Sequence, residues 1–219
     1  MEQLIESLIS EGYLKTLGII ESFRKIDRAD FVPESLKDEA YINAPLPIGF
    51  GQTISQPLTV AFMFELLQPE PGDKILDVGA GSGWTAALLA HIVSKNKNYE
   101  SRIMNQEYLG GKVFVIERIP ELYKLGESNV SKYNFIKKGI VKFYCQDGSR
   151  GLPKEAPFDK IIAAASAEKI PEVWKEQLKT GGRLVTPVGA SIWLLIKKSE
   201  KEFIEEEYPG FAFVPLIKE

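Results

Sequence analysis

The sequence predicts a single α/β domain in which a mostly parallel sheet is covered by helices on both faces. Short β-branched runs alternate with helical segments from Leu58 to Gly189, which is the pattern of parallel strands joined by crossover helices. The chain has 219 residues, 44% of them apolar, so it is long enough for one domain with one sizeable core. After Gly189 the alternation stops, and further strand-like segments predict an antiparallel C-terminal edge.

The first helices are predicted by apolar residues at helical spacing that begin at Leu4 and at Leu17. A third helical pattern covers Val60–Leu67 and stops at Pro69. The later helices are expected over Thr85–Val93, Pro120–Tyr133 and Pro171–Gln177. The parallel strands are expected at Lys74–Val78, Lys112–Glu117, Val141–Asp147, Asp159–Ala164 and Arg183–Pro187, and the edge strands at Ile192–Lys197 and Phe211–Leu216. The charged run Lys197–Glu207 between the edge strands is expected to be a solvated turn.

The stretch Phe31–Pro57 differs from the periodic segments around it. It holds four prolines and two glycines but also several aromatic and aliphatic residues, whereas a flexible linker would be polar. Long irregular segments inside compact domains are usually functional or disordered, and the apolar content argues against disorder. We therefore expect an ordered functional loop here.

Composition excludes several classes of protein. A formal net charge of −3 and a pI near 5.5 disfavour binding to a nucleic-acid backbone. With one cysteine and one histidine, the chain has no His/Cys cluster for a metal such as zinc, and a hydrolytic triad would depend on His91 alone. The N-terminus does not have the pattern of a secretory signal, and no apolar stretch approaches membrane-spanning length. We therefore expect a soluble cytoplasmic protein.

The strongest site signal is the glycine loop Gly79–Gly83, which follows the strand Lys74–Val78 and precedes a helix. Glycines at this position let the backbone turn tightly and approach a ligand at the carboxyl end of the strand. Compared with the dinucleotide pattern G-x-G-x-x-G, the third glycine comes one residue early. Asp77, two residues before the loop, suits a ligand that carries a cation, such as the ammonium and sulfonium groups of S-adenosylmethionine.

Two further acids end neighbouring strands. Glu117 closes the second strand, where a carboxylate can accept hydrogen bonds from both ribose hydroxyls. Asp147, followed by Gly148, closes the third strand, where it could accept from the exocyclic amine of an adenine. Each acid alone would be interpreted as an exposed helix cap. Together, three strand ends that finish in acids predict one crevice for a nucleoside-bearing ligand.

With these residues in hand, the chain resembles the protein-L-isoaspartate (D-aspartate) O-methyltransferase family, over roughly Phe31 to Leu216. The most specific match is Pro45-Leu-Pro-Ile-Gly-Phe-Gly-Gln-Thr-Ile-Ser-Gln-Pro57, which resembles that family's signature upstream of the glycine loop. Further matches are Phe31-Val-Pro-Glu34, Asp77-Val-Gly-Ala-Gly-Ser-Gly83, Val115-Ile-Glu-Arg-Ile-Pro-Glu-Leu122, Gln146-Asp-Gly148, Ala156-Pro-Phe-Asp159, Gly181-Gly-Arg-Leu-Val-Thr-Pro-Val-Gly189 and Phe213-Val-Pro-Leu216.

The resemblance implies a Rossmann-like S-adenosylmethionine methyltransferase that methylates the α-carboxylate of L-isoaspartyl residues in damaged proteins and peptides. The ester then closes to a succinimide, which hydrolyses partly to normal aspartate. Ser55 corresponds to the family's active-site serine. The cofactor contacts implied are Thr53, Ile54, Ser55, Asp77, Gly79, Ala80, Gly81, Glu117, Arg118, Asp147 and Gly148.

The resemblance also implies a division of the chain into functional segments. Residues 1–57 would form N-terminal helices and a substrate-side loop, residues 58–189 a cofactor-binding core, and residues 190–219 the C-terminal antiparallel strands. The implied partners are isoaspartyl proteins and peptides, with no nucleic acid, membrane or metal, and we expect a monomer.

This reaction explains the scarcity of histidine. A carboxylate with a pKa of about 4 is ionised at neutral pH, so no general base is needed to produce the nucleophile. The protein then has two tasks, to orient the carboxylate toward the methyl group of the cofactor and to exclude water from the site. We expect the Ser55 hydroxyl and nearby backbone N–H groups to orient the carboxylate. The simpler interpretation of Ser55 is an N-cap for the helix that starts near Leu58, and one residue can do both.

Other functions remain open. The chain could methylate ordinary aspartate in a biosynthetic peptide or a small molecule, or it could be a non-catalytic adaptor that binds S-adenosylmethionine. A nicotinamide oxidoreductase is disfavoured by the glycine spacing.

The chain also departs from the family's pattern. Ser94–Gly111 is longer than the connection usual in the family, and we expect an exposed insertion rather than a substrate-selective flap. Asn43 stands where an aspartate is common. Among residues without a predicted role, His91 is expected to be a packed or half-exposed helix residue, and Cys145 an inert thiol in a buried strand.

Overall fold

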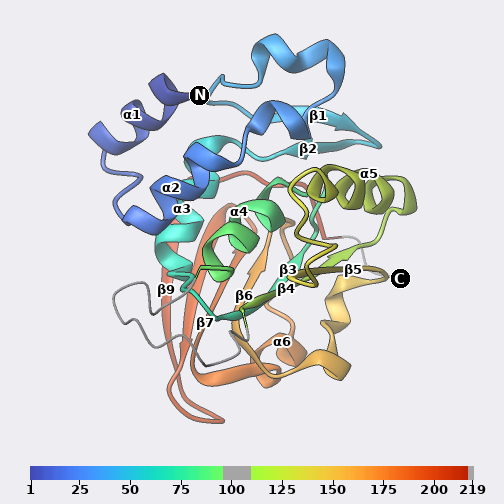
Figure 1. Ribbon diagram of the computed structural model, residues 1–219. Coiled ribbons are helices and arrows are strands. Elements are labelled where there is room, and N and C mark those ends of the chain that lie inside the picture. The colour runs from blue at the N-terminus through green and yellow to red at the C-terminus, as the bar shows by residue number, and fades with distance from the viewer. Residues whose placement is uncertain (96–109, 217–219) are drawn as a thin grey trace, which may run out of the picture.

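The computed structural model describes residues 1–95 and 110–216 and contains a seven-stranded sheet with a separate two-stranded hairpin (Figure 1). The strands are β1 (Leu46–Gly49), β2 (Gln52–Ile54), β3 (Lys74–Val78), β4 (Lys112–Glu117), β5 (Val141–Cys145), β6 (Phe158–Ala163), β7 (Leu178–Val188), β8 (Ser191–Lys197) and β9 (Phe203–Pro209). The α-helices are α1 (Glu2–Ser10), α2 (Leu17–Lys25), α3 (Pro57–Leu67), α4 (Trp84–Val93), α5 (Pro120–Ser131) and α6 (Glu172–Glu176). Short 3₁₀ helices are η1 (Arg28–Phe31), η2 (Glu34–Glu39), η3 (Gly148–Arg150) and η4 (Pro153–Glu155).

The order of strands in the large sheet is β5-β4-β3-β6-β7-β8-β9. The five strands from β5 to β7 are parallel, and β8 and β9 are antiparallel to their neighbours. From β3 the chain proceeds outward through β4 to β5, then returns to place β6 on the other side of β3. The strand order therefore reverses at β3, and ligands of open α/β sheets bind at the carboxyl ends of strands at such a point.

Two apolar clusters cover opposite faces of the sheet, because successive side chains of a strand point to opposite faces. In β3, Ile75 belongs to the larger cluster, which also contains residues of α1 to α5, whereas Leu76 and Val78 belong to the smaller one. The smaller cluster is closed by Trp174 of α6, which is fully buried. The α/β class and the helices on both faces are as predicted.

The antiparallel edge is confirmed, but its last strand is formed by residues other than those predicted. The charged run expected to be a turn contributes β9, in register with β8 from Lys197↔Phe203 to Ser191↔Pro209. An outer strand with both faces exposed needs no apolar alternation, so its charges gave no strand signal. The predicted strand Phe211–Leu216 is wrong, since that segment is irregular apart from a single bridge between Ser166 and Pro215.

The prediction of a buried Cys145 is also wrong, because Cys145 is exposed. It is the last residue of β5, and β5 is the outermost strand of the parallel part of the sheet. A β-branched or aromatic run on an outer strand resembles a buried strand in sequence, although one of its faces is partly open. His91 lies half-buried on α4, as expected, with its Nε2 atom 3.5 Å from the Glu21 carboxylate.

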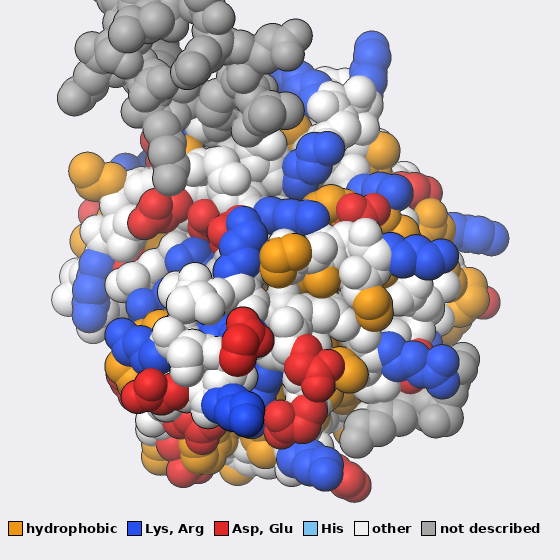
Figure 2. Space-filling model, turned by 90° about the horizontal axis from the view of Figure 1, so that it is seen from below, with side chains coloured by type: hydrophobic (Ala, Val, Ile, Leu, Met, Phe, Trp, Pro, Cys, Tyr) orange, Lys and Arg blue, Asp and Glu red, His pale blue; other side chains and the backbone are white. Residues whose placement is uncertain are grey.

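The stretch Phe31–Pro57 is ordered, as predicted, and folds into η2 and the β1–β2 hairpin. The hairpin and the N-terminal helices lie beyond the carboxyl ends of the parallel strands, at the top of Figure 1. The opposite face, at the amino ends of these strands, carries acidic and basic side chains interspersed with each other (Figure 2). The prediction about the segment Ser94–Gly111 falls almost wholly on residues 96–109, which lie outside the described residues. Among the described residues, no helix is long and apolar enough to cross a membrane.

Candidate active site

A cavity of about 570 Å³ opens at the carboxyl ends of β3, β4 and β6. Its volume lies within the range of small-molecule sites, about 300–1,000 Å³. Six segments line it: the β1–β2 hairpin with its continuation into α3, the end of β3 with the glycine loop and the start of α4, the end of β4, Gly148 of η3, Ala164 and Ala165 after β6, and the chain beyond β9. The lining includes Pro45, Gln52, Thr53, Ile54, Ser55, Gln56, Gly79, Ala80, Gly81, Ser82, Trp84, Thr85, Glu117, Arg118, Ile119, Gly148 and residues 210–216.

The glycine loop forms the floor of the cavity and is closely packed from two sides. At Gly81, with φ of +54°, an added Cβ would lie 3.1 Å from Ile48 Cδ1 of the hairpin. At Gly83, with φ of +88°, an added Cβ would lie 2.9 Å from the Gly126 carbonyl oxygen in α5. The missing side chains thus allow both the hairpin and α5 to approach the loop backbone. The predicted cofactor residues Gly79, Ala80 and Gly81 all line the cavity.

Glu117 ends β4 and faces the glycine loop. Its side chain is 7% exposed, Oε2 accepts from the Gly81 N–H at 2.9 Å, and Oε1 accepts from the Ile119 N–H at 2.9 Å. These two bonds fix the carboxylate at the cavity wall, and each oxygen keeps a lone pair for a further donor. Arg118 follows it in the lining.

Asp77 is fully buried behind the cavity wall. Its Oδ2 accepts from the Thr85 hydroxyl at 2.8 Å, and Thr85 itself lines the cavity. Its Oδ1 has no hydrogen-bond partner among the described residues. Burial raises the pKa of Asp77 to about 7, the Thr85 bond opposes the rise, and the negative charge of Glu117 adds to it. A buried carboxylate with one oxygen unpaired is suited to a cationic ligand group nearby.

Asp147 caps a short helix beside the cavity. The strand β5 ends before it, and its carboxylate caps η3: Oδ1 accepts from the Ser149 N–H and Oδ2 from the Ser149 hydroxyl, both at 2.8 Å. The residue that lines the cavity here is Gly148. An added Cβ on Gly148 would lie 2.4 Å from Val78 Cγ1, so only glycine fits this wall.

Thr53, Ile54 and Ser55 line the cavity at the end of the hairpin, where the chain continues into α3. No cap for α3 comes from Ser55 in the described structure, because the Leu58 N–H donates to Asn43 Oδ1 at 3.0 Å. Asn43 therefore accepts the N-terminal N–H bond of α3 that Ser55 would accept if it were the N-cap.

Sequence reasoning missed the segment Gly210–Leu216 as a wall of the cavity. Four backbone bonds hold it there: the N–H groups of Gly210 and Phe211 both donate to the Ala190 carbonyl. The Ser166 N–H donates to the Val214 carbonyl, and the Leu216 N–H donates to the Ser166 carbonyl. Phe211 also stacks on Phe62 of α3, with ring centroids 5.2 Å apart. The apolar residues that suggested a strand serve instead to pack this segment over the site.

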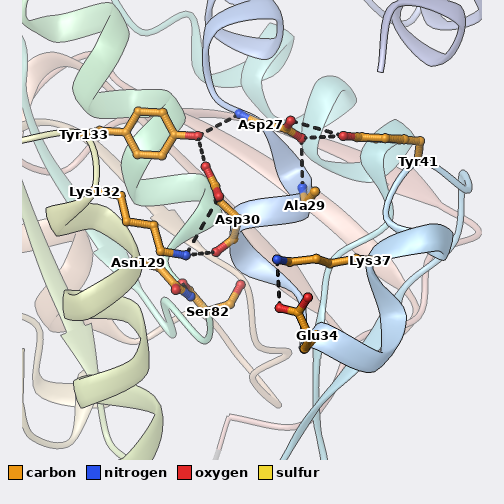
Figure 3. Close-up of polar contacts among 10 residues, drawn as sticks. All are labelled: Asp27, Ala29, Asp30, Glu34, Lys37, Tyr41, Ser82, Asn129, Lys132 and Tyr133. Carbon is orange, nitrogen blue, oxygen red and sulfur yellow. Dashed lines mark hydrogen bonds and ion pairs between the residues drawn. The ribbon is translucent and has the colours of Figure 1, made fainter.

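A polar network holds the N-terminal segment against α5 (Figure 3). The Tyr133 hydroxyl accepts from the Asp27 N–H at 2.9 Å and donates to Asp30 Oδ2 at 2.7 Å. Burial, together with the Asp30 bond, raises the pKa of Tyr133. One turn earlier in the same region, Asn129 Nδ2 donates to the Ser82 carbonyl of the glycine loop at 3.0 Å. The helix α5 and the residues directly after it thus contact both the glycine loop and the segment around η1.

A cavity at the reversal point of a parallel sheet, with a glycine loop after the first strand and an acid after the second, defines the class of protein: a Rossmann-like domain with the S-adenosylmethionine methyltransferase fold. A Plasmodium falciparum structure described as a protein-L-isoaspartate O-methyltransferase, in complex with S-adenosyl-L-homocysteine, shares the fold at a TM-score of 0.83, covering 99% of this chain and 98% of its own at 24% identity. A second solved protein-L-isoaspartate O-methyltransferase gives a TM-score of 0.82 over 98% of this chain and 65% of its own, at 25% identity.

The chain belongs to the protein-L-isoaspartate (D-aspartate) O-methyltransferase family, whose model matches residues 1–219. A protein-L-isoaspartate O-methyltransferase of Methanopyrus kandleri is 44% identical over 222 residues, covering 100% of this chain and 91% of the relative. Another of Aeropyrum pernix is 40% identical over 221 residues, covering 99% and 79%. The resemblance stated from the motifs is confirmed.

Proposed function

We propose that this chain uses S-adenosylmethionine to methylate the α-carboxylate of L-isoaspartyl residues in damaged proteins and peptides, and so initiates their repair through a succinimide. The observation that carries the proposal is that the family signature, with Ser55, and the glycine loop line one cavity together with Glu117. Membership of the family over the whole chain supports the same function.

The residues in and behind the cavity wall fit the cofactor. Gly81 leaves its backbone open to a ligand, and Glu117 provides a fixed carboxylate for ribose hydroxyls. Asp77, buried behind the wall with Oδ1 unpaired among the described residues, provides a negative group for an ammonium. We propose that Gly79, Ala80, Arg118 and Gly148 complete the contacts, with Thr53 and Ile54 beside the methyl group. Asp147 caps η3 and would thereby hold Gly148, the first residue of that helix, in its position at the cavity wall. When bound, the cofactor supplies an activated methyl group.

The chain's own task is to position the substrate. The isoaspartyl carboxylate arrives ionised, so the reaction needs no group to remove a proton. In the described structure Ser55 makes no cap for α3. Its hydroxyl can therefore donate to one carboxylate oxygen of the substrate and leave the other oxygen to attack. The apolar wall formed by Ile54 and residues 210–216 excludes water from this side of the cavity.

Methyl transfer to matched peptides that carry L-isoaspartate or L-aspartate at one position tests the proposal. We expect strong preference for the L-isoaspartyl peptide and release of one S-adenosylhomocysteine per methyl ester. Preference for the L-aspartyl peptide would assign the chain to another substrate, and cofactor binding without transfer to either peptide would make it an adaptor.

The role of Ser55 is tested by Ser55→Ala, with Ser128→Ala on the exposed face of α5 as the control. Loss of one orienting hydrogen bond is expected to lower kcat about tenfold to hundredfold, equivalent to about 1.4–2.8 kcal/mol. The Kd for S-adenosylhomocysteine should change little, because the loop at Gly79–Gly83 is untouched. A Ser55→Ala enzyme with the kcat of the Ser128→Ala control would remove Ser55 from the mechanism.

Three further features belong to this proposal. Residues 1–57 form the substrate side, since Ser55 and the hairpin come from them, and the cofactor side comes from the segment 58–189. The chain acts as a monomer, which the charged edge strand β9 supports. It works in the cytoplasm, where a reducing environment keeps the exposed thiol of Cys145 unoxidised.

A further inference from the structure

Arg28, the first residue of η1, is fully buried and binds four backbone carbonyl oxygens of the segment that leads to α3. Its Nη1 donates to Ala40 at 2.7 Å and to Ile42 at 3.3 Å. Its Nη2 donates to Ala44 at 2.9 Å and to Ser55 at 3.1 Å. One guanidinium therefore fixes both ends of the stretch that contains the hairpin.

The same guanidinium contacts the cofactor side of the site. Its Cζ lies 5.4 Å from the ring centroid of Trp84, within the range of a cation–π contact. Trp84 is the first residue of α4, directly after the glycine loop, and it lines the cavity. Arg28 is thus bonded to the backbone of Ser55 on one side and packed on Trp84 on the other.

The charge of Arg28 is balanced by dipoles rather than by an acid. Burial lowers the pKa of Arg28 to about 10, and no carboxylate among the described residues offsets this. The group still carries its proton at neutral pH, and hydrogen bonds from a charged donor are stronger than neutral ones. A buried charge is costly unless its bonds are well made, so the four carbonyls are held at the positions that the planar guanidinium requires.

We propose that Arg28 is a positioning residue for methyl transfer: by bonding the Ser55 carbonyl and the 40–44 turn while packing on Trp84, it sets the Ser55 hydroxyl at its working distance from the glycine loop. The proposal rests on the proposed function, because it gives Ser55 a role in the reaction. It implies that the substrate side can shift relative to the cofactor side when this one group is changed.

The test compares Arg28→Lys and Arg28→Met with the control Arg24→Met, whose exposed side chain pairs with Glu2 and Glu6 on the surface. A lysine keeps the charge but offers one nitrogen, which cannot reach two pairs of carbonyls at once. We expect Arg28→Lys to fold, to bind S-adenosylhomocysteine within about threefold of the unaltered protein, and to lose at least tenfold in kcat on an isoaspartyl peptide. Arg28→Met should lose more, and Arg24→Met should match the unaltered protein.

Amide hydrogen exchange provides a readout that does not depend on activity. In Arg28→Lys, exchange should rise for peptides within residues 40–57 and stay unchanged for β3 and β4. A kcat within twofold of the unaltered enzyme would overturn the proposal. So would a loss of kcat that merely follows loss of S-adenosylhomocysteine binding or of folded protein, since that is the result of a structural role alone.

The two proposals can fail separately. If the unaltered chain transfers no methyl group to isoaspartyl peptides, the proposed function is wrong. In that case, faster exchange confined to residues 40–57 would still identify Arg28 as the group that holds Ser55, and uniform or unchanged exchange would refute this as well.

Discussion

Replacing Asp77 by asparagine should make the ligand-free protein more stable at alkaline pH and leave it unchanged at acid pH. Asp77 is fully buried, and within the described part of the chain only its Oδ2 has a partner, the hydroxyl of Thr85. The charged form is therefore poorly solvated in the folded protein and well solvated in the unfolded chain. Asparagine has nearly the same shape and can keep the Thr85 contact without carrying a charge.

The sign and size of the effect follow from the pKa of Asp77, which burial raises from 3.8 to about 7. Folding then takes up a proton between these two values, so the stability of the wild-type protein falls as pH rises through this range. At about 1.4 kcal/mol for each pH unit, the full difference is about 4 kcal/mol, reached above pH 7 and absent below pH 4. Other titrating groups are shared by both proteins and cancel in the comparison.

The assay is urea unfolding of the wild-type protein and Asp77→Asn at several values between pH 4 and 9, without ligand. A difference between the two free energies of unfolding that stays constant over this range would refute the reasoning. Titration with S-adenosylhomocysteine provides the matching functional result. Its ammonium group favours ionised Asp77, so wild-type affinity should rise as pH increases through about 7, and Asp77→Asn should bind more weakly without this dependence.

Three other substitutions test single contacts of the site. In Glu117→Gln, an amide NH₂ group faces one of the two backbone N–H groups, of Gly81 and Ile119, that donate to the carboxylate. This change should weaken S-adenosylhomocysteine binding by about 1.5–3 kcal/mol in calorimetry; unchanged affinity would contradict a role of Glu117 in binding. Gly148→Ala would bring a methyl group within 2.4 Å of Val78 and should cost about 1–3 kcal/mol of stability in urea unfolding, unless the wall can move. Asn43→Ala should cost about 1 kcal/mol by removing the oxygen that caps α3, whereas Asn43→Asp should cost nothing; equal losses for both would show that the cap is not the cause.

The parts of the fold that follow from local pattern could be predicted from the sequence. The glycine loop lies between a buried strand and a helix, and all three signals are contiguous along the chain. Asp77 and Glu117 could be expected near each other because parallel strands end at the same edge of a sheet; Glu117 lines the cavity, whereas Asp77 lies buried behind its wall. For Asp147 the sequence allowed both a ligand contact and a helix cap, and the structure shows the cap, in which the carboxylate accepts from the backbone and the hydroxyl of Ser149.

Features that depend on long-range contacts were not predictable. The bond from Arg28 to the backbone carbonyl of Ser55 joins residues 27 positions apart. Every residue has a backbone carbonyl, so the sequence does not show which one will accept this bond. The edge strand β9 was missed for a different reason: its pairing is set by the hairpin with β8, whereas its composition is that of an exposed turn. The segment after β9 has the apolar residues of a strand, but it uses them to cover the cavity.

The charged side chains of β9 have a consequence for the behaviour of the protein at high concentration. β9 ends the sheet, so one row of its backbone groups has no neighbouring strand within the described sheet. The three consecutive glutamates Glu205, Glu206 and Glu207 are exposed there, on both faces of the strand. A strand from a second molecule that added to this row would bring like charges together, which disfavours growth of the sheet by stacking of copies. The acidic edge strand β9 thus protects this protein from aggregation through its sheet edge, a process to which its aged substrates are themselves exposed.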